Sequence, residues 1–262
     1  MPIPFWKMHG AGNDFILVDD RSLSFPLGDP AYCIRLCDRR RGVGAEGVLL
    51  LQPSAAADFR MRFINPDGTE AEMCGNGARC LARLAFEQGL APADMTLETP
   101  AGIVRAEVLL PRVRLHLPPP HSLRMNEPLE WNGRPWVFHS IHAGVPHAVT
   151  FVDDLQAIPV AELGAHVRRH PLFQPAGTNV DVAQVTGPNS LAVRTYERGV
   201  EAETPACGTG VVASAWIARA LDLVREPVQV RTAGGETLEV EIHPLTLTGP
   251  AEHVFQGHIP YR

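Results

Sequence analysis

The sequence predicts an α/β (α+β) protein of two pseudo-symmetric domains, each a curved, mostly antiparallel sheet wrapped around a central helix. The first supporting observation is an internal repeat. Cys74 and Cys207 both precede a Gly-x-Gly triplet, and they lie 133 positions apart. The same spacing carries three residues of the first copy onto identical residues of the second: Glu70 and Glu203, Thr99 and Thr232, Gly102 and Gly235. We interpret the chain as two copies of one supersecondary unit.

Two helical patterns supply the second observation, at residues 75–88 and 208–221. In the first, Arg79, Arg83 and Glu87 make a single polar stripe, and Gly89 is a natural terminator. The second is apolar nearly all round. A helix with so little polar surface must be enclosed by other elements.

Alternating apolar and polar residues around both helices supply the third observation, because this pattern is typical of strands. The expected strands are 59–65, 103–108, 113–117, 228–231, 237–242 and 254–259. Pro66-Asp67-Gly68 is a strong turn signal after the first of them. Each helix is therefore expected to be wrapped by β-structure.

The domain boundary is expected at Pro118-Pro119-Pro120, because three consecutive prolines continue neither a helix nor a central strand. This divides the chain into an N-terminal domain, 1–118, and a C-terminal domain, 119–253. The final segment, about 254–262, is a candidate to return to the N-terminal domain. The sequence alone leaves that pairing open.

Bulk composition excludes several classes of protein. The 262 residues are 45% hydrophobic and carry a net charge of −6. The chain therefore lacks the excess of positive charge that is typical of proteins that bind nucleic acid or an anionic membrane. No signal peptide or membrane span is apparent in the sequence. The five cysteines contain no Cys-x-x-Cys pair, and the histidines have no metal-ligand spacing, so we expect no metal site. A reducing cytoplasm fits this cysteine usage.

One glycine motif is interpreted as a decoy. Residues 42–47 satisfy G-x-G-x-x-G, but an arginine-rich segment precedes them and the strand-like run Val48–Leu51 follows. The dinucleotide fingerprint requires a strand before it and a helix after it. We therefore expect a tight loop here and no dinucleotide.

Cys74 and Cys207 are the candidate reactive groups, because a thiol at a helix N-terminus has a lowered pKa. Cys33, Cys37 and Cys80 are expected to be small buried hydrophobes. Two facing thiols suit a cofactor-free racemase or epimerase, in which a thiolate removes a proton from one face of a carbon and a thiol returns one to the other. Pyridoxal phosphate requires a Schiff-base lysine, and the only lysine is Lys7.

The chain resembles the diaminopimelate epimerase family. The matching segments are residues 7–15, 65–70 with 74–79, 177–180, and 196–199 with 207–210. The resemblance implies two pseudo-symmetric domains with the active site in the cleft between them, no cofactor, a homodimer, and interconversion of LL- and meso-diaminopimelate for lysine and cell-wall synthesis.

The resemblance also assigns residues. It implies substrate contacts from Asn13, Asn65, Asn179, Glu197 and Arg198, of which Arg198 suits a bidentate grip on a carboxylate. It implies that His147 and Glu197 tune the two cysteines. Backbone N–H groups at the two helix N-termini are expected to hold the carbanion's charge on the α-carboxylate, and they belong to Gly75, Asn76, Gly208 and Thr209.

Two departures from the family pattern affect recognition of the substrate. Val145 stands where the family commonly has an asparagine, and Gly47 stands where some relatives have a glutamine. Neither change touches the cysteines, so both departures bear on recognition of the substrate and leave the reaction type unaffected. The alternatives are a racemase of another amino or imino acid, and a non-catalytic binding protein or a thiol redox protein. The two retained Gly-x-Gly cysteines argue against simple binding, and the lack of Cys-x-x-Cys argues against redox catalysis.

Overall fold

The computed structural model describes residues 2–71 and 73–260, and these residues form two compact units. The N-terminal unit comprises residues 1–116 and 248–262, and the C-terminal unit comprises residues 117–247. The sequence-based boundaries were 118/119 and 253/254. Glu72 of the first cysteine motif and the last two residues of the 254–262 segment lie outside the described residues.

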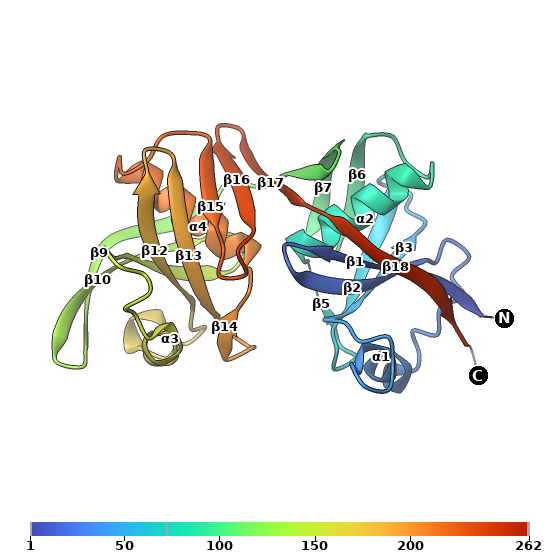
Figure 1. Ribbon diagram of the computed structural model, residues 1–262, viewed down its shortest axis with the longest axis horizontal. Helices are drawn as coiled ribbons and strands as arrows, with labels where there is room; N and C mark the ends of the chain where they lie inside the picture. The colour runs from blue at the N-terminus through green and yellow to red at the C-terminus, as the bar shows by residue number, and fades with distance from the viewer. Residues whose placement is uncertain (1, 72, 261–262) are drawn as a thin grey trace. The chain divides into compact units, whose positions relative to one another are not determined.

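The N-terminal unit is a mixed sheet with two helices (Figure 1). Its strands pair in the order β18–β1–β2–β3–β4–β6–β7–β8, and β5 adds to β4. Only the β2–β3 and β4–β6 pairs are parallel. The elements are β1 (Ile3–Gly10), β2 (Asn13–Asp19), α1 (Pro30–Cys37), β3 (Val48–Gln52), β4 (Phe59–Ile64), β5 (Glu70–Ala71), α2 (Gly75–Glu87), β6 (Asp94–Thr99), β7 (Gly102–Leu109), β8 (Arg112–His116) and β18 (Glu252–Ile259). The C-terminal strand thus pairs antiparallel with the first strand of the chain.

The C-terminal unit repeats this topology. Its strands pair in the order β9–β10–β11–β12–β13–β15–β16, β14 adds to β13, and the parallel pairs are β11–β12 and β13–β15. The elements are β9 (His121–Trp131), β10 (Arg134–His142), β11 (Pro146–Phe151), α3 (Val160–Val167), the 3₁₀ turn η1 (Pro171–Phe173), β12 (Asn179–Gly187), β13 (Ser190–Glu197), β14 (Ala202–Thr204), α4 (Gly208–Ala220), β15 (Val228–Arg231) and β16 (Thr237–Ile242). The boundary back to the N-terminal unit falls inside β17 (Leu245–Pro250).

The 133-residue register extends beyond the segment in which the sequence revealed it. Moving the bounds of α2 by 133 residues gives the bounds of α4, and moving the first residue of β2 gives the first residue of β11. The repeat therefore includes the strand pairs that precede the cysteines. The predicted fold class is confirmed, and the predicted helices end within one residue of the observed ones.

The polar stripe of α2, formed by Arg79, Arg83 and Glu87, does not face solvent along its whole length. Arg79 is fully buried and donates through Nε to the Pro250 carbonyl at 3.2 Å. Arg83 donates to the Ala251 carbonyl and to Glu87. The segment that leads into β18 therefore covers the stripe, and arginine donors satisfy its backbone acceptors.

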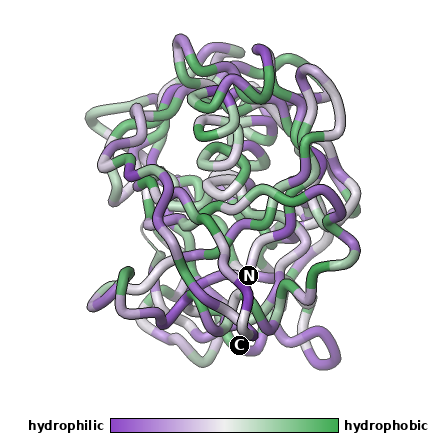
Figure 2. The backbone as a smooth tube through the Cα atoms, turned by 90° about the vertical axis from the view of Figure 1, so that its left-hand side faces the viewer, coloured by the Kyte–Doolittle hydropathy of each residue, from purple (hydrophilic) through white to green (hydrophobic). Residues whose placement is uncertain are grey.

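In the C-terminal unit, α4 is enclosed by strands, as Figure 2 shows. Eight of its residues are buried, among them Gly210 in the first turn. A Cβ on Gly210 would lie 2.3 Å from Oδ1 of Asp181 on β12 and 3.0 Å from Oγ1 of Thr195 on β13. The glycine therefore lets the first turn of α4 lie directly on two polar side chains of the sheet.

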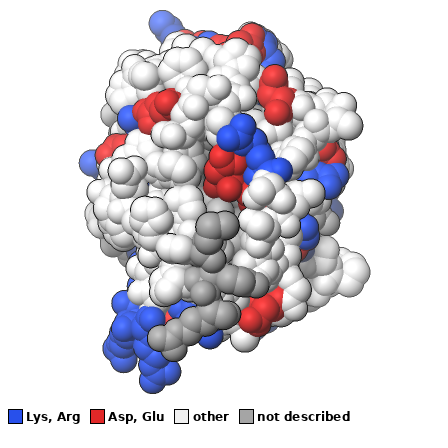
Figure 3. Space-filling model, turned by 90° about the vertical axis from the view of Figure 1, so that its right-hand side faces the viewer, with Lys and Arg blue, Asp and Glu red and all other residues white. Residues whose placement is uncertain are grey.

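The face of the N-terminal unit seen in Figure 3 carries charges of both signs, with a concentration of Lys and Arg at the lower left and wide uncharged areas elsewhere. Within the described part of the chain, no helix has the length and apolar character needed to cross a bilayer.

This packing predicts opposite effects for two glycine substitutions. Gly210→Ala should destabilise the C-terminal unit by about 1–3 kcal/mol, because the new methyl group overlaps the Asp181 carboxylate. Gly75→Ala is the matched control in the first turn of α2, where the nearest atom to a Cβ is 3.9 Å away. It should be neutral or stabilising by up to ~1 kcal/mol. Urea denaturation of both variants tests this, and equal effects would contradict it.

Candidate active site

Cys74 forms the N-cap of α2 in an extended backbone conformation. Its Sγ accepts the Gly77 N–H at 3.5 Å and donates to Oδ1 of Asn13 at 3.7 Å. The same Asn13 oxygen accepts the amide of Asn76 at 3.1 Å, and buried Arg79 donates to Oδ1 of Asn76 at 2.8 Å. The structure thus brings together three of the predicted site residues, Asn13, Cys74 and Asn76.

A charged cluster holds Asn13 in this position. The Asn13 amide donates to Glu46, and burial raises the pKa of Glu46 although the Asn13 bond opposes it. The neighbouring Asp14 binds Lys7 at 2.5 Å and Arg39 at 2.6 Å. Although burial opposes it, these two cations lower the pKa of Asp14. Lys7, within β1, also donates to the carbonyl oxygen of Gly44 in the 42–47 glycine loop. Strand β3 follows this loop, as the sequence predicted, and no helix does.

Two further predicted positions of the N-terminal unit have structural roles. Asn65 lies in the turn between β4 and β5, where its amide donates to Oγ1 of Thr69 at 3.1 Å. Gly47 has a φ of +155°. A Cβ there would lie 2.2 Å from Cε2 of Phe63 and 2.7 Å from the carbonyl oxygen of Ile64. The glutamine of some relatives therefore does not fit this backbone.

Cys207 forms the N-cap of α4 and is 8% exposed. Its Sγ lies 3.4 Å from the hydroxyl oxygen of Thr209, one of the predicted substrate-binding residues. Gly208 begins the helix, in the position that Gly75 occupies in α2. The C-terminal unit thus places a thiol at the N-terminus of the helix that is equivalent to α2.

His147, at the start of β11, is fully buried beside this helix terminus. Its Nε2 lies 2.9 Å from Oγ1 of Thr209 and 3.4 Å from Nδ2 of Asn179. Its Nδ1 lies 2.7 Å from Oδ2 of Asp181, which is also fully buried. Sequence reasoning missed Asp181, although a lone carboxylate in the apolar strand Val180-Asp181-Val182 was an available signal.

Glu197 is the last residue of β13 and Arg198 follows it, and the two side chains bond to other groups. Glu197 accepts the hydroxyl of Thr204. The Arg198 backbone N–H donates to Oδ1 of Asn179 at 2.7 Å, and its Nη1 donates to the Ala176 carbonyl at 2.9 Å. These bonds connect Asn179 and Arg198 to the network around His147.

The predicted lowering of the thiol pKa is wrong for Cys207. Burial raises its pKa well above the ordinary value, and the negative charges of Glu197 and Asp181 add to the effect, although the Thr209 hydroxyl opposes it. The helix terminus does not overcome the loss of solvation and two nearby carboxylates. Cys207 is therefore a thiol in this state, which suits the acid partner of an acid–base pair.

The other cysteines are as expected. Cys33, Cys37 and Cys80 are buried. Burial raises the pKa of all three thiols, to about 11 for Cys37 and to about 12 for Cys80. They are inert packing residues.

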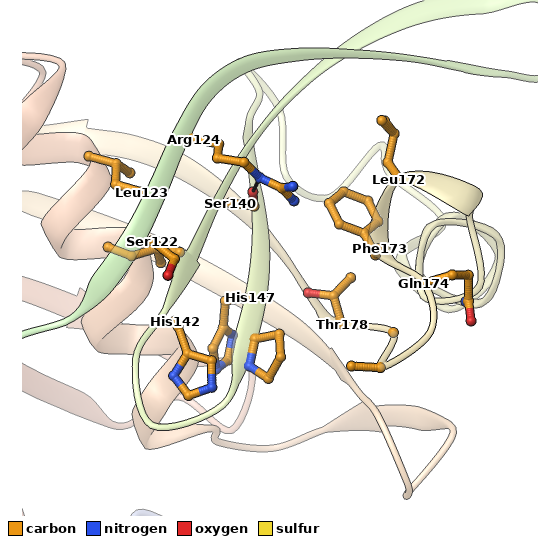
Figure 4. Close-up of a pocket in the computed structure, with 14 residues that line it drawn as sticks. Ser122, Leu123, Arg124, Ser140, His142, His147, Leu172, Phe173, Gln174 and Thr178 are labelled. Atoms are coloured by element: carbon orange, nitrogen blue, oxygen red, sulfur yellow. Dashed lines mark hydrogen bonds between the residues drawn. The ribbon is translucent and has the colours of Figure 1, made fainter.

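A cavity of about 330 Å³ opens beside His147 within the C-terminal unit (Figure 4). His142 lies next to His147 in this view, and Phe173 and Gln174 line the other side. Burial lowers the pKa of His142, and the nearby His121, His147 and Arg198 add to this effect. Among residues 2–71 and 73–260, no cluster of His, Cys, Asp and Glu is placed to hold a metal ion.

The family model for diaminopimelate epimerase matches residues 5–111 and 139–254. The chain belongs to the diaminopimelate epimerase family. A diaminopimelate epimerase from Moorella thermoacetica is 41% identical, over 98% of this chain and 99% of that protein. One from Archaeoglobus fulgidus is 42% identical, over 98% and 96%. Membership of this family makes the chain an isomerase of the epimerase type.

The chain is also similar to solved structures, and at their low sequence identity this similarity concerns the fold alone. A Bacillus anthracis phenazine biosynthesis protein of the PhzF family aligns over the whole length of both chains with a TM-score of 0.77 at 17% identity. A hydroxyproline epimerase from Agrobacterium vitis aligns over 98% of this chain and 92% of its own with a TM-score of 0.69 at 18% identity.

The electrostatics of Cys207 predict the effect of neutralising Glu197. Glu197→Gln removes a negative charge that disfavours the thiolate, so the pKa of Cys207 should fall. The midpoint of Cys207 alkylation by iodoacetamide, followed by peptide mass spectrometry, should then move to lower pH. Glu162→Gln, on the exposed face of α3, is the control and should leave the midpoint unchanged. An unchanged or higher midpoint in Glu197→Gln would refute this assignment.

Proposed function

We propose that the chain interconverts LL- and meso-diaminopimelate by two-base proton transfer, with Cys74 and Cys207 as the catalytic residues. The observation that carries the proposal is the repeat itself. Two equivalent helices each present a cysteine at their N-cap, in a chain of the diaminopimelate epimerase family. No cofactor takes part in this mechanism.

The reaction requires a stabilised carbanion. When one sulfur removes the α-proton, negative charge spreads onto the α-carboxylate, and the first N–H groups of a helix lack intrahelical acceptors. Gly75 and Asn76 in α2, with Gly208 and Thr209 in α4, supply such donors. The second sulfur then delivers its proton to the opposite face of the carbon.

The distal end of the substrate is assigned to the region around Arg198 and the cavity beside His147. Arg198 offers a guanidinium to a carboxylate, and Asn179 is held in place by the Arg198 backbone. Val145 offers only van der Waals contact, so an amide contact common in the family is replaced here by backbone or water.

Single substitutions of the cysteines test the two-base assignment. Cys74→Ala and Cys207→Ala should each abolish epimerisation of LL-diaminopimelate, because one face of the carbon then lacks an acid or base. Cys33→Ala and Cys80→Ala remove buried thiols and should retain turnover once folded. The measurement is the rate of meso-diaminopimelate formation. Normal turnover by either Cys74→Ala or Cys207→Ala would eliminate the two-base mechanism.

A substrate panel tests specificity. Arg198→Ala should lower kcat/KM for diaminopimelate by about 10–100-fold, since charge-assisted hydrogen bonds contribute roughly 1.5–3 kcal/mol. Val145→Asn should change KM only modestly. If the wild-type protein turns over monocarboxylic amino or imino acids as efficiently as LL-diaminopimelate, the assignment fails and the alternative racemase function is supported.

The proposed assembly is a homodimer in the cytoplasm, without nucleic-acid or membrane partners. Val254 and Phe255 on β18 support the dimer, because they are 55% and 49% exposed on a strand at the end of the sheet. The net charge of −6 supports the lack of nucleic-acid and membrane partners. The free cysteines support a location in the cytoplasm. Light scattering after size exclusion measures the oligomeric state, and a monomer at micromolar concentration would contradict the dimer.

A further inference from the structure

A series of hydrogen bonds with a single direction runs from Arg79 in α2 to Glu46 in the 42–47 glycine loop. Nη2 of Arg79 donates to Oδ1 of Asn76 at 2.8 Å, and Nδ2 of Asn76 donates to Oδ1 of Asn13 at 3.1 Å. Nδ2 of Asn13 then donates to the Glu46 carboxylate. Sγ of Cys74 lies 3.7 Å from the same Oδ1 of Asn13.

The two charged ends fix the direction of both amides. A guanidinium has only donors, so the Asn76 atom that faces Arg79 is the carbonyl oxygen. The Asn76 nitrogen therefore faces Asn13 and requires the Asn13 oxygen as its acceptor. This leaves the Asn13 NH₂ group to face Glu46, whose carboxylate accepts. Reversing either amide would place two donors or two acceptors together, so Asn13 presents its carbonyl to Cys74.

Close packing around Arg79 holds the series in place. Arg79 is fully buried and also donates to the carbonyls of Pro250 at 3.2 Å and Gly75 at 3.5 Å. A Cβ on Gly10, at the end of β1, would lie 2.8 Å from the Asn76 carbonyl oxygen and 3.3 Å from Nη2 of Arg79. The backbone of β1 thus confines both groups, and a side chain at residue 10 would displace them.

The C-terminal unit repeats the fold but not this series. The strand pairs β2–β3 and β11–β12 have the same register after a shift of 133 residues. That shift carries three members of the series, Asn13, Asn76 and Arg79, onto Pro146, Thr209 and Val212. Proline and valine side chains form no hydrogen bonds. The series therefore distinguishes Cys74 from Cys207.

We propose that the Asn13 carbonyl makes Cys74 the base of the two-base pair, and that Arg79 and Glu46 are positioning residues that hold this carbonyl against the sulfur. In the step, the Cys74 thiolate takes the α-proton of the substrate. The C–H bond breaks, its electron pair stays on the carbon and the α-carboxylate, and an S–H bond forms. The new S–H then donates to Oδ1 of Asn13.

An acceptor opposite the sulfur favours the product of this step over its starting state. A thiolate has no proton to give to a carbonyl oxygen, whereas an S–H can donate to it, so the hydrogen bond forms only as the proton arrives. The Gly77 N–H donates to the same sulfur at 3.5 Å and stabilises the thiolate from the helix side. The inference rests on the proposed function and names which sulfur is the base.

Charged groups approach Cys74 from two elements, namely Arg79 from its own helix and Glu46, through Asn13, from the glycine loop. Burial lowers the pKa of Arg79, and the nearby Cys80 and Cys74 oppose this effect. Burial raises the pKa of Cys80 to about 12, so this neighbouring thiol stays neutral while Cys74 is titrated. The Asn13 dipole therefore acts on Cys74 beside a fixed positive charge.

Alkylation of Cys74 tests the role of Asn13 in the free protein. Asn13→Ala removes the carbonyl and admits water to the sulfur, so the midpoint of Cys74 alkylation by iodoacetamide should move to lower pH by about 0.5–1 unit, as expected for the loss of one hydrogen bond. Tryptic cleavage after Arg79 separates Cys74 from Cys80 for mass spectrometry. Asn65→Ala is the matched control, because the Asn65 amide bonds to Thr69, and it should leave the midpoint unchanged.

Kinetics separate this role from a contact with the substrate. In Asn13→Ala the thiolate is a weaker base, so kcat should fall about 2–3-fold, and the acid limb of the kcat/KM profile should move with the alkylation midpoint. If Asn13 only contacts the substrate, KM rises and the midpoint of the free protein stays where it is. That result would overturn the proposal.

Neutron diffraction from deuterated crystals tests the direction of the series without activity. The Asn13 deuterons should lie on the atom that faces Glu46, and the Asn76 deuterons on the atom that faces Asn13. An Asn13 nitrogen directed at Cys74, or an unchanged or higher alkylation midpoint in Asn13→Ala, would refute the assignment. If the wild-type protein does not epimerise diaminopimelate, the proposed function fails, while the midpoint and the deuteron positions still decide how Asn13 acts on Cys74.

Discussion

The first turn of a helix leaves its backbone N–H groups without intrahelical acceptors, and both halves of this chain place a cysteine at that point. The rest of α4 is almost entirely apolar and has to be enclosed by strands. Enclosure also buries the start of α4, where Cys207 is 8% exposed, and the glycines of its first turn leave room for the polar side chains of the sheet. Gly210 lies so close to Asp181 and Thr195 that any side chain would disrupt the polar network beneath the helix.

The same register supports two different environments for the two sulfurs. Cys74 donates to Asn13, which in turn donates to Glu46. Buried Arg79 donates to Asn76 in the first turn of the same helix. In the C-terminal unit, carboxylates surround Cys207 and burial keeps it protonated. A repeated fold thus presents unlike thiols, and a two-base mechanism needs one sulfur to begin as an acid and the other as a base.

Much of this arrangement could be predicted from local sequence, because the helices, strands and turns around each cysteine carry periodic patterns and glycine signals. The burial of Arg79 could not, since the carbonyl that covers it belongs to Pro250, 171 residues away. The raised pKa of Cys207 depends on two strands, β12 and β13, that bring Asp181 and Glu197 to the helix terminus. Local patterns predict elements, whereas these effects come from side chains that only the sheet topology brings together.

Deuterium incorporation tests the two-base account most directly. Wild-type protein is incubated with LL-diaminopimelate in deuterated water, and substrate and product are analysed by mass spectrometry and NMR at low conversion. If one sulfur removes the proton and the other delivers a different one, the first meso-diaminopimelate formed carries solvent deuterium at the inverted carbon, while the remaining LL-isomer is unlabelled. Product that retains the original proton, or remaining substrate labelled as fast as product forms, would contradict the account.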